Sequence, residues 1–479
     1  MKQWTAYING QFIANQSAQW MDATYPATGE IVGQVQACTE VDVHDAVHAA
    51  KAAFQAWKRT PAYERENYVK KWITLLREEK TYKNIGNLIS AEMGKPLEAA
   101  NNEAFYSADL AEYQSQWARR IDGEIVTSDS TNERILIEKE PLGVVAIIVP
   151  WNFPIYVLTR KVIPALIAGN TVVIKPSVKS PISALAIAEL FHQAGFPAGV
   201  VNVVTGSDDI VGEALTSSEV NMITFTGSTR VGKKIMEKAS QKMIRVSLEL
   251  GGKAPAIVMP DADLNLAVQA IKGGRLSNSG QVCSNTERVY VHESIAQAFI
   301  EKIVAAFQDV QVADGRLQPN AEVASLVSKA DATRINTMVQ TAVVQGATIA
   351  CGGHIMHELG DSFYAPTILT NCYQQMDIVQ QEVFGPVLPI LTFKTIDEAI
   401  ALANDSDYGL TSNIYTNSYQ SVMKLTKELE FGEVYVNRQQ GEAYQGYHAG
   451  WKKSGIGGDD GKHGFEEFLQ QKTVYLAFE

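Results

Sequence analysis

The stretch Val144-Val145-Ala146-Ile147-Ile148-Val149-Pro150-Trp151-Asn152-Phe153-Pro154 decides the fold. Its first six residues form a continuous apolar run, which is typical of a strand buried on both faces of a sheet. Similar runs follow at 171–174, 200–204, 222–225 and 256–259, with amphipathic stretches such as 183–194 and 229–240 between them. This alternation of β and α elements predicts a parallel α/β sheet.

A second series of alternating elements begins after Asn285. We expect strands at 288–291, 387–393, 412–415 and 434–436, and helices at 295–307, 330–345 and 395–403. The chain therefore has two predicted α/β units that meet near Gly251-Gly252. Outside them, residues 1–30 indicate a short β element, 40–117 a helical region, and 122–140 two β segments. We expect these two segments to pair with the tail at 473–476, in an exposed ribbon that would invite a partner subunit.

Composition excludes several classes of protein. The chain has 479 residues, of which 46% are hydrophobic and 20% charged, as in an ordinary globular protein. Its net charge of −12 argues against a nucleic-acid or anionic-membrane partner. The longest apolar run, 144–150, is too short to span a bilayer, and the N-terminus lacks a leader pattern, so we expect a cytoplasmic protein. The four cysteines form no Cys-x-x-Cys pair, which argues against disulfides and a zinc cluster, and we expect no metal.

Two side chains suggest covalent catalysis. Cys283 lies in Ser279-Gly280-Gln281-Val282-Cys283-Ser284, where a glycine allows close approach to a ligand. Glu249 lies in Leu248-Glu249-Leu250-Gly251-Gly252-Lys253. A thiol and a carboxylate can serve as nucleophile and general base. Either motif alone is more often structural, because most free cysteines are small buried hydrophobic residues.

Polar residues at strand ends suggest a ligand site, although each also has an ordinary structural explanation. Asn152 could donate to a developing oxyanion, or only satisfy its own turn. Lys175, in Ile174-Lys175-Pro176-Ser177, could bind a ribose or phosphate, or only be solvated. Gly227 to Gly232 follow a strand and open a helix whose N–H groups could receive a pyrophosphate, although serine and threonine there are also common helix caps. Glu382, in Glu382-Val383-Phe384-Gly385-Pro386, could accept from ribose hydroxyls or lie in an exposed turn.

Taken in order, these motifs resemble those of the aldehyde dehydrogenase superfamily, and the resemblance covers essentially the whole chain. It implies an α/β fold with a Rossmann-like coenzyme domain at 1–121 and 143–251 and an α/β catalytic domain at 252–450. It also implies a small β oligomerisation extension at 122–142 and 460–479, which builds a homodimer or a homotetramer.

The resemblance also implies roles for individual residues. Cys283 resembles the nucleophile that attacks an aldehyde, Asn152 an oxyanion donor, and Glu249 the base that activates water to hydrolyse the thioester. Lys175 and Glu382 resemble ribose ligands of NAD or NADP, and Trp151 and Phe384 resemble packing neighbours of that cofactor. Further cofactor contacts are expected from Ser177, Val178, Lys179, Gly227, Ser228, Gly232 and Leu250.

One departure leaves the choice between NAD and NADP open. Relatives that prefer NAD commonly have a glutamate three positions after the ribose lysine, where this chain has Val178 followed by Lys179. Loss of the carboxylate removes repulsion of a 2′-phosphate, and the added cation could attract it. Alternatively, Lys179 faces solvent and NAD binds through Lys175.

The C-terminal segment resembles the lactaldehyde and glycolaldehyde branch of the superfamily, on Asn437-Arg438 and on the stretches 444–458 and 459–464. Arg160, Ser284, Glu442 and His448 are the predicted substrate residues, and the arginine, glutamate and histidine could together bind an α-hydroxyl. Alternatively, Arg160 pairs with a structural carboxylate. A semialdehyde dehydrogenase, a CoA-acylating relative and a non-enzymatic relative remain as other functions, and Glu249 argues against the CoA-acylating one.

Overall fold

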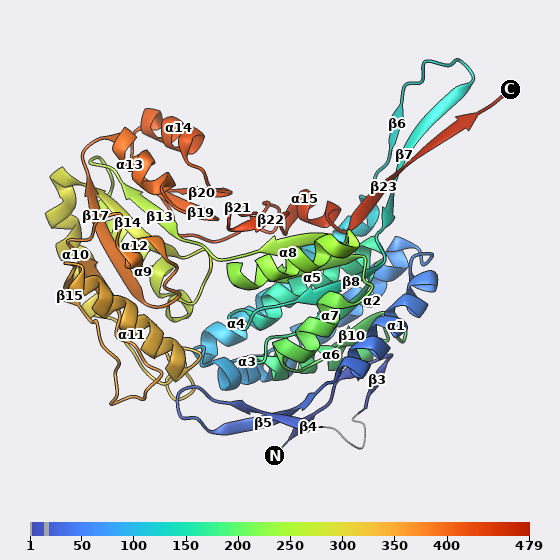
Figure 1. Ribbon diagram of the computed structural model, residues 1–479, viewed down its shortest axis with the longest axis horizontal. Helices are drawn as coiled ribbons and strands as arrows, with labels where there is room; N and C mark the ends of the chain where they lie inside the picture. Colours follow the sequence, from blue (N-terminus) through green and yellow to red (C-terminus); the bar gives the residue numbers. More distant parts are fainter. Residues whose placement is uncertain (1, 14–18) are drawn as a thin grey trace.

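Two mainly parallel sheets form the framework of the protein (Figure 1). The computed structural model describes residues 2–13 and 19–479. Residues 1 and 14–18 belong to the β element predicted at 1–30 and lie outside the described residues. The α/β fold predicted from the alternating apolar runs is confirmed.

The first sheet has eight strands in the order β22-β12-β11-β8-β9-β10-β2-β3. Its five central strands pair in parallel. They are β8 (Val144–Ile148), β9 (Thr171–Lys175), β10 (Val201–Val203), β11 (Met222–Thr226) and β12 (Arg245–Glu249), with β2 (Tyr7–Ile8), β3 (Gln11–Phe12) and β22 (Gly455–Ile456) toward the edges. The short strands β2, β3 and β22 join their neighbours antiparallel, and β3 and β22 form the two edges.

Helices cover both faces of this sheet, which explains why its strands are continuously apolar. Val145 and Ile147 pack into one core with α2 to α6, whereas Val144 and Ala146 pack into another with α1, α7 and α8. The helices are α1 (Glu40–Trp57), α2 (Ala62–Arg77), α3 (Glu79–Met93), α4 (Leu97–Ser115), α5 (Pro154–Ala168), α6 (Pro181–Gln193), α7 (Glu213–Ser217) and α8 (Thr229–Lys242). Successive strand residues point to opposite faces, so neither face can be polar.

The second sheet has seven strands in the order β15-β16-β17-β14-β13-β19-β20. All pairs are parallel except that of the edge strand β15 with β16. The strands are β13 (Ala254–Val258), β14 (Thr286–His292), β15 (Thr348–Cys351), β16 (Thr367–Thr370), β17 (Val387–Phe393), β19 (Thr411–Tyr415) and β20 (Glu433–Val436). The helices are α9 (Leu264–Leu276), α10 (Ala296–Gln308), α11 (Lys329–Val344), α12 (Asp377–Gln380), α13 (Ile396–Asn404) and α14 (Tyr419–Glu428). Helix α15 (Gly461–Glu466) packs instead against α5, and its Phe465 lies in the core of the first sheet.

A three-stranded ribbon projects from the body at the end that carries the C-terminus (Figure 1). It consists of β6 (Glu124–Val126), β7 (Glu133–Pro141) and β23 (Leu469–Ala477). β23 pairs antiparallel with β7 from Leu469–Pro141 to Ala477–Glu133, which confirms the predicted pairing of the tail. Two small sheets complete the fold, one of β1 (Gln3–Trp4), β5 (Ile31–Ala37) and β4 (Gln19–Thr24), and one of β18 (Tyr408–Gly409) and β21 (Trp451–Lys452).

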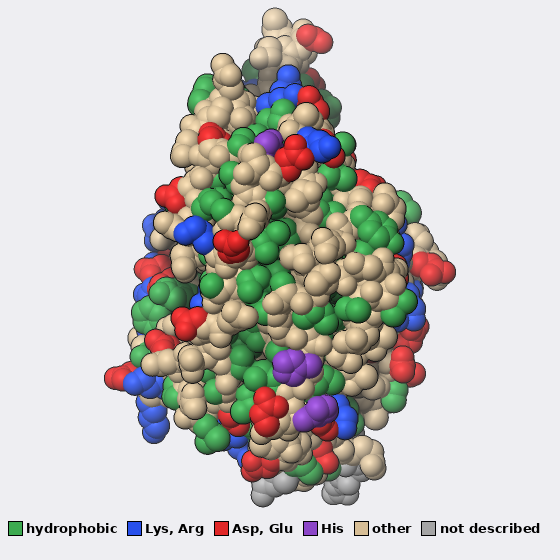
Figure 2. All heavy atoms as spheres, turned by 90° about the vertical axis from the view of Figure 1, so that its left-hand side faces the viewer, with side chains coloured by type: hydrophobic (Ala, Val, Ile, Leu, Met, Phe, Trp, Pro, Cys, Tyr) green, Lys and Arg blue, Asp and Glu red, His purple; other side chains and the backbone are tan. Residues whose placement is uncertain are grey.

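Charged side chains of both signs lie on the surface. Figure 2 shows the face on the side of the seven-stranded sheet, where acidic and basic side chains are interspersed and lie mostly toward the edges. In the part of the chain that the structure describes, no helix combines the length and the apolar character that a membrane crossing requires.

Candidate active site

The predicted catalytic side chains meet where the two sheets join. Glu249 is the last residue of β12, and Asn152 follows the end of β8 by four residues. Cys283 comes from the second half, in the loop before β14. All three line one cavity of about 370 Å³, which we call the central pocket. Parallel strands bring ligand-binding residues together at such sheet ends, so the structure brings together residues that are up to 131 positions apart in the sequence.

The loop before Cys283 has an unusual backbone. Asn278, Ser279 and Gly280 all have positive φ, at 49°, 57° and 80°. A Cβ on Gly280 would lie 2.2 Å from the carbonyl carbon of Gly385, so only glycine fits there. The Ser279 hydroxyl bonds the backbone of residue 324, donating to its carbonyl and accepting from its N–H, each at 3.0 Å. Backbone strain of this kind persists only where the surroundings hold it, and it is common at functional sites.

A cluster of buried ion pairs holds this loop in place. Nη1 of Arg275 donates to Oε1 of Glu287 at 2.7 Å, and Nη2 donates to the carbonyls of Gly280 and Gly385. Glu287 also accepts the N–H groups of residues 383 and 384, and pairs with Lys253 at 2.8 Å. Burial by itself would raise the pKa of Glu287, but Arg275 and Lys253 lower it to about 2. One cluster therefore fixes both the Cys283 loop and the loop that carries Glu382.

Asn152 is bonded to the same loop. Its Nδ2 donates to the carbonyl of Gln281 at 2.9 Å, two residues before the thiol. Its own carbonyl accepts from Nζ of Lys95 at 2.8 Å and from Nδ2 of Asn278 at 3.1 Å. The side-chain amide is thereby held at the wall of the central pocket, beside Cys283.

Glu249 is buried at the back of the central pocket. Among the described residues, neither of its carboxylate oxygens has a hydrogen-bond partner. Its pKa is raised to about 8, mainly by burial, although His448 with Nε2 3.6 Å away opposes the rise. Burial also raises the pKa of the Cys283 thiol, and a hydrogen bond with His448 lowers it. A carboxyl that titrates near neutrality suits a general base.

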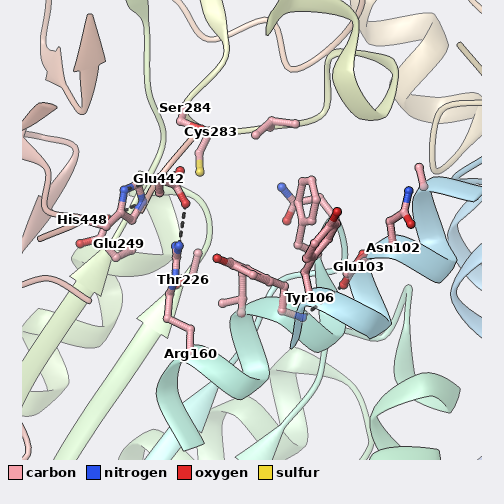
Figure 3. A pocket seen from close by; sticks show the side chains of 16 residues that line it. Asn102, Glu103, Tyr106, Arg160, Thr226, Glu249, Cys283, Ser284, Glu442 and His448 are labelled. Carbon is pink, nitrogen blue, oxygen red and sulfur yellow. Dashed lines mark hydrogen bonds and ion pairs between the residues drawn. The ribbon is translucent and has the colours of Figure 1, made fainter. Parts of the chain in front are cut away.

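A charged wall lies beside the thiol (Figure 3). Arg160, two turns into α5, pairs with Glu442 at 2.6 Å and with Asp460 at 2.9 Å. His448 lies with Nδ1 3.1 Å from Glu433 and 3.7 Å from Glu442. Burial lowers the pKa of His448, but these carboxylates and the Cys283 hydrogen bond raise it well above the usual value.

The structure therefore brings all four predicted substrate residues, Arg160, Ser284, Glu442 and His448, into the central pocket. Arg160 also has the structural partner that the alternative interpretation expected, because Asp460 is buried.

The opposite wall of the central pocket is aromatic and was missed in the sequence. Tyr106 lies on it, together with Glu103 and Asn102 from α4 (Figure 3). Phe153 and Tyr156 also line the pocket, and the Tyr156 ring centroid lies 5.0 Å from the Arg160 guanidinium. Helix α4 lies in the helical region at 40–117, where the pattern indicated only packing. Tyr156 lies four residues before Arg160, so the two share a helix face, and this spacing was the one available signal.

The predicted cofactor residues line the adjoining strand ends. Lys175, at the end of β9, is buried and pairs with Asp208 at 2.5 Å. Helix α8 begins after Ser228, whose hydroxyl caps it by accepting from the N–H of residue 231. A Cβ on Gly232 would lie 2.6 Å from Leu250, so this helix packs closely against the strand. The N–H groups of a helix N-terminus can bind a pyrophosphate, and a lysine at a strand end can bind a ribose.

Glu382, Trp151 and Phe384 are further predicted cofactor residues. Oε1 of Glu382 accepts from the N–H of Gly252 at 2.9 Å, and burial raises the pKa of this carboxyl to about 7. The Trp151 and Phe384 rings meet edge to face at 5.6 Å.

The position that departs from the NAD-preferring pattern lies on the surface. Val178 is 40% exposed. Lys179 is paired with Asp331 at 2.8 Å, its Nζ lies 5.2 Å from the Trp151 ring centroid, and its N–H donates to Ser177 Oγ. The sequence indicated an added cation, and the structure shows that its charge is shared with a carboxylate.

Comparison with known proteins agrees with this geometry. Residues 12–474 match the aldehyde dehydrogenase family. Lactaldehyde dehydrogenase of Escherichia coli (strain K12) is 45% identical over 471 residues, which cover 98% of each protein. The 3,6-anhydro-alpha-L-galactose dehydrogenase of Vibrio sp. (strain EJY3) is 41% identical over 483 residues, which cover 100% of each.

Solved structures agree as well. The crystal structure of Escherichia coli lactaldehyde dehydrogenase matches with a TM-score of 0.97 at 44% identity, covering 99% of both chains. A 3,6-anhydro-L-galactose dehydrogenase in complex with NAP matches with a TM-score of 0.96 at 40% identity, covering 99% of this chain and 100% of the other. The chain belongs to the aldehyde dehydrogenase family and is an NAD(P)-dependent aldehyde dehydrogenase.

Proposed function

We propose that this enzyme oxidises a small α-hydroxy aldehyde, such as lactaldehyde or glycolaldehyde, to the carboxylic acid. The observation that carries the proposal is the charged wall of Arg160, Glu442 and His448 beside the Cys283 thiol. A guanidinium, a carboxylate and an imidazole there can donate to and accept from a hydroxyl on the carbon next to the carbonyl. The likeness to a lactaldehyde dehydrogenase supports this proposal.

We propose the following roles for the catalytic side chains. The Cys283 thiolate forms a bond to the aldehyde carbon, and the carbonyl oxygen becomes an oxyanion that the Asn152 amide and the Cys283 N–H stabilise. A bound nicotinamide cofactor would supply the acceptor for the hydride of this carbon, and loss of that hydride would leave a thioester on Cys283. Glu249 then takes a proton from the water that attacks the thioester, and the bond between the acyl carbon and sulfur breaks, which releases the acid and restores the Cys283 thiolate.

We propose that Lys175 and Glu382 bind the cofactor's ribose hydroxyls and that the start of α8 receives its pyrophosphate. Val178 supports tolerance of NADP, because a neutral side chain does not repel a 2′-phosphate. The ion pair of Lys179 with Asp331 limits how strongly that phosphate is attracted. We therefore expect the enzyme to accept both cofactors.

The same charges argue against a semialdehyde as the preferred substrate. The second carboxylate of a semialdehyde substrate would need a cation that is not already paired. Arg160 already contacts Glu442 and Asp460. Burial of Glu249 beside the thiol supports hydrolysis over transfer to CoA. The aromatic wall supports a wider substrate range, because a three-carbon aldehyde would leave Tyr106 and Tyr156 free to contact a longer polyol or a sugar ring.

We also propose that the ribbon of β6, β7 and β23 joins copies of the chain into a homodimer or homotetramer. Ile125 on its edge strand is exposed, and an open, apolar strand edge is a template for pairing. Size-exclusion chromatography with light scattering tests this proposal, and a monomer at micromolar concentration would contradict it.

A panel of aldehydes tests the substrate. We expect kcat/KM for lactaldehyde to exceed that for propanal by on the order of 10²-fold or more, because a site that binds a hydroxyl leaves polar groups unpaired when the hydroxyl is missing. His448→Ala should shrink this gap more than it lowers propanal turnover. His463→Ala, at an exposed histidine, serves as the control. Equal rates on lactaldehyde and propanal, or a preference for succinic semialdehyde, would exclude the α-hydroxy aldehyde.

A further inference from the structure

An ion pair lies buried beneath the turn that carries Asn152. Lys95 follows Gly94, which ends α3 with a φ of 81°, and Glu103 lies in the second turn of α4. The two side chains bond directly to each other, and each is only 1% exposed. Moving two charges out of water costs more than an apolar pair of the same size, so a pair in this position is weak evidence for a stabilising role.

The contacts of the pair converge on one segment. Nζ of Lys95 donates to the carbonyl of Asn152 at 2.8 Å and lies 3.7 Å from the centroid of the Phe153 ring. Oε1 of Glu103 accepts the N–H groups of Ile155 at 3.0 Å and Tyr156 at 3.3 Å. These N–H groups belong to the first turn of α5, which lacks a side-chain cap of its own. The pair therefore holds the residues on both sides of Phe153.

Asn152 is fixed from two directions as a result. From the nucleophile loop, Asn278 donates to its carbonyl and Gln281 accepts from its side-chain amide. From the helical side, Lys95 donates to the same carbonyl. Catalytic groups must be held to within fractions of an ångström, and small displacements lower rates strongly. Removal of Lys95 would leave the Asn152 carbonyl with the loop contact alone.

We propose that Lys95 and Glu103 are positioning residues for the oxyanion site, and that they act by fixing the backbone of Asn152 so that its amide faces the aldehyde oxygen at Cys283. The proposal rests on the proposed role of Asn152 as the oxyanion donor. Neither side chain needs to touch the reacting atoms, because Lys95 acts on the Asn152 main chain and Glu103 on the start of α5.

The test variant is Lys95→Met combined with Glu103→Gln. This change removes both charges together, which avoids an unpaired buried ion, and a glutamine oxygen can still accept the α5 N–H groups. We expect kcat on lactaldehyde to fall by about 10- to 100-fold, less than the roughly 10²- to 10³-fold that loss of an oxyanion donor causes. The matched control is Lys83→Met with Glu79→Gln, an exposed pair on α3, which should keep kcat unchanged.

Two further readouts separate positioning from general loosening of the structure. Alkylation of Cys283 by iodoacetamide forms no oxyanion, so its rate should stay within about twofold of wild type, and cofactor affinity should do the same. If alkylation and cofactor affinity change together with kcat, the pair is only structural and the proposal is wrong.

A mutant cycle tests the link to Asn152. In an Asn152→Ala background the pair substitution should cause no further loss of kcat, because the group that it positions is gone. If the pair substitution lowers kcat by the same factor in the Asn152→Ala background as in the wild type, the positioning proposal is overturned, and Asn152 can still be the oxyanion donor. Normal turnover in Asn152→Ala alone would instead refute the oxyanion role itself, and the positioning role with it.

Discussion

The two sheets contribute their predicted site residues in different ways. The eight-stranded sheet supplies Asn152, Lys175 and Glu249 at or within four residues of the carboxyl ends of its strands. The seven-stranded sheet supplies Cys283 and Glu382 from loops that precede its strands. Groups at strand ends inherit their positions from the hydrogen-bond ladder and the two packed cores. Groups in loops have no such support.

The loop side makes up for this with buried charge and a strained backbone. Arg275 and Glu287 bond to the loops of both Cys283 and Glu382, and Asn278 and Ser279 have left-handed backbone conformations. A change on the strand side should therefore stay local. A change in the buried cluster should alter the nucleophile and the cofactor site together.

The largest effect is expected from the loop side itself. Cys283→Ser should lower dehydrogenase activity by roughly 10⁶-fold, the scale of losing a nucleophile, because a serine alkoxide is hard to form and is a poorer leaving group. Cofactor binding, measured by fluorescence titration, should be nearly unchanged. Cys351→Ser is the matched control and should stay active. Turnover near wild type in Cys283→Ser would refute the mechanism.

On the strand side, Glu249→Gln should lower steady-state turnover by roughly 10²- to 10⁴-fold, the usual contribution of a general base. A burst of reduced cofactor should remain, and mass spectrometry should detect a trapped thioester. In the wild type, hydrolysis should speed up as pH rises through about 8, because only the ionised carboxylate can accept a proton. Loss of the burst in the variant would mean that Glu249 acts before hydride transfer.

Arg275→Met breaks the charged cluster directly. Without Arg275, the buried carboxylate of Glu287 keeps only Lys253 as a paired cation. We therefore expect the free energy of unfolding to fall by about 3–5 kcal/mol in urea titrations. At low temperature, where the variant is still folded, the rate of Cys283 alkylation and the cofactor affinity should both change. In Glu249→Gln both should stay as in the wild type. A change in only one of them would show that the two loops are held independently.

The smallest effect concerns the edge of the cofactor site. Val178→Glu should shift the ratio of kcat/KM values toward NAD by about 1–3 kcal/mol, the usual scale of a hydrogen bond to a charged group. Initial rates with each cofactor measure this shift, and Val178→Gln, of similar size without the charge, is the control. If the wild type already rejects NADP and neither variant alters the ratio, another part of the chain distinguishes the 2′-hydroxyl of NAD from the 2′-phosphate of NADP.

The site residues at the strand ends of the eight-stranded sheet could largely be predicted from the sequence. The apolar run at 144–149 predicted β8, and the polar residues after the runs at 144–149 and 171–174 indicated a ligand site at those strand ends. The pattern works there because burial on both faces forces every strand residue to be apolar, and parallel strands align their ends. Residue chemistry marked Cys283 and Glu382 only as candidates, and the resemblance to a family was needed to assign their roles, because no periodicity marks a loop. The domain boundaries and the roles of the site residues remain predictions.

By itself, the amino-acid sequence determined the two α/β sheets and the β7–β23 pairing, and it supplied the candidate catalytic side chains. Only the tertiary structure decided which charges neutralise one another: Lys179 with Asp331, Arg160 with Asp460, and Lys95 with Glu103. These partners lie between 8 and 300 residues apart, so no local pattern links them. Burial sets the cost of each charge, and burial is a property of the packed chain, so the ionisation of Glu249 and His448 could be decided only after folding brought their neighbours together.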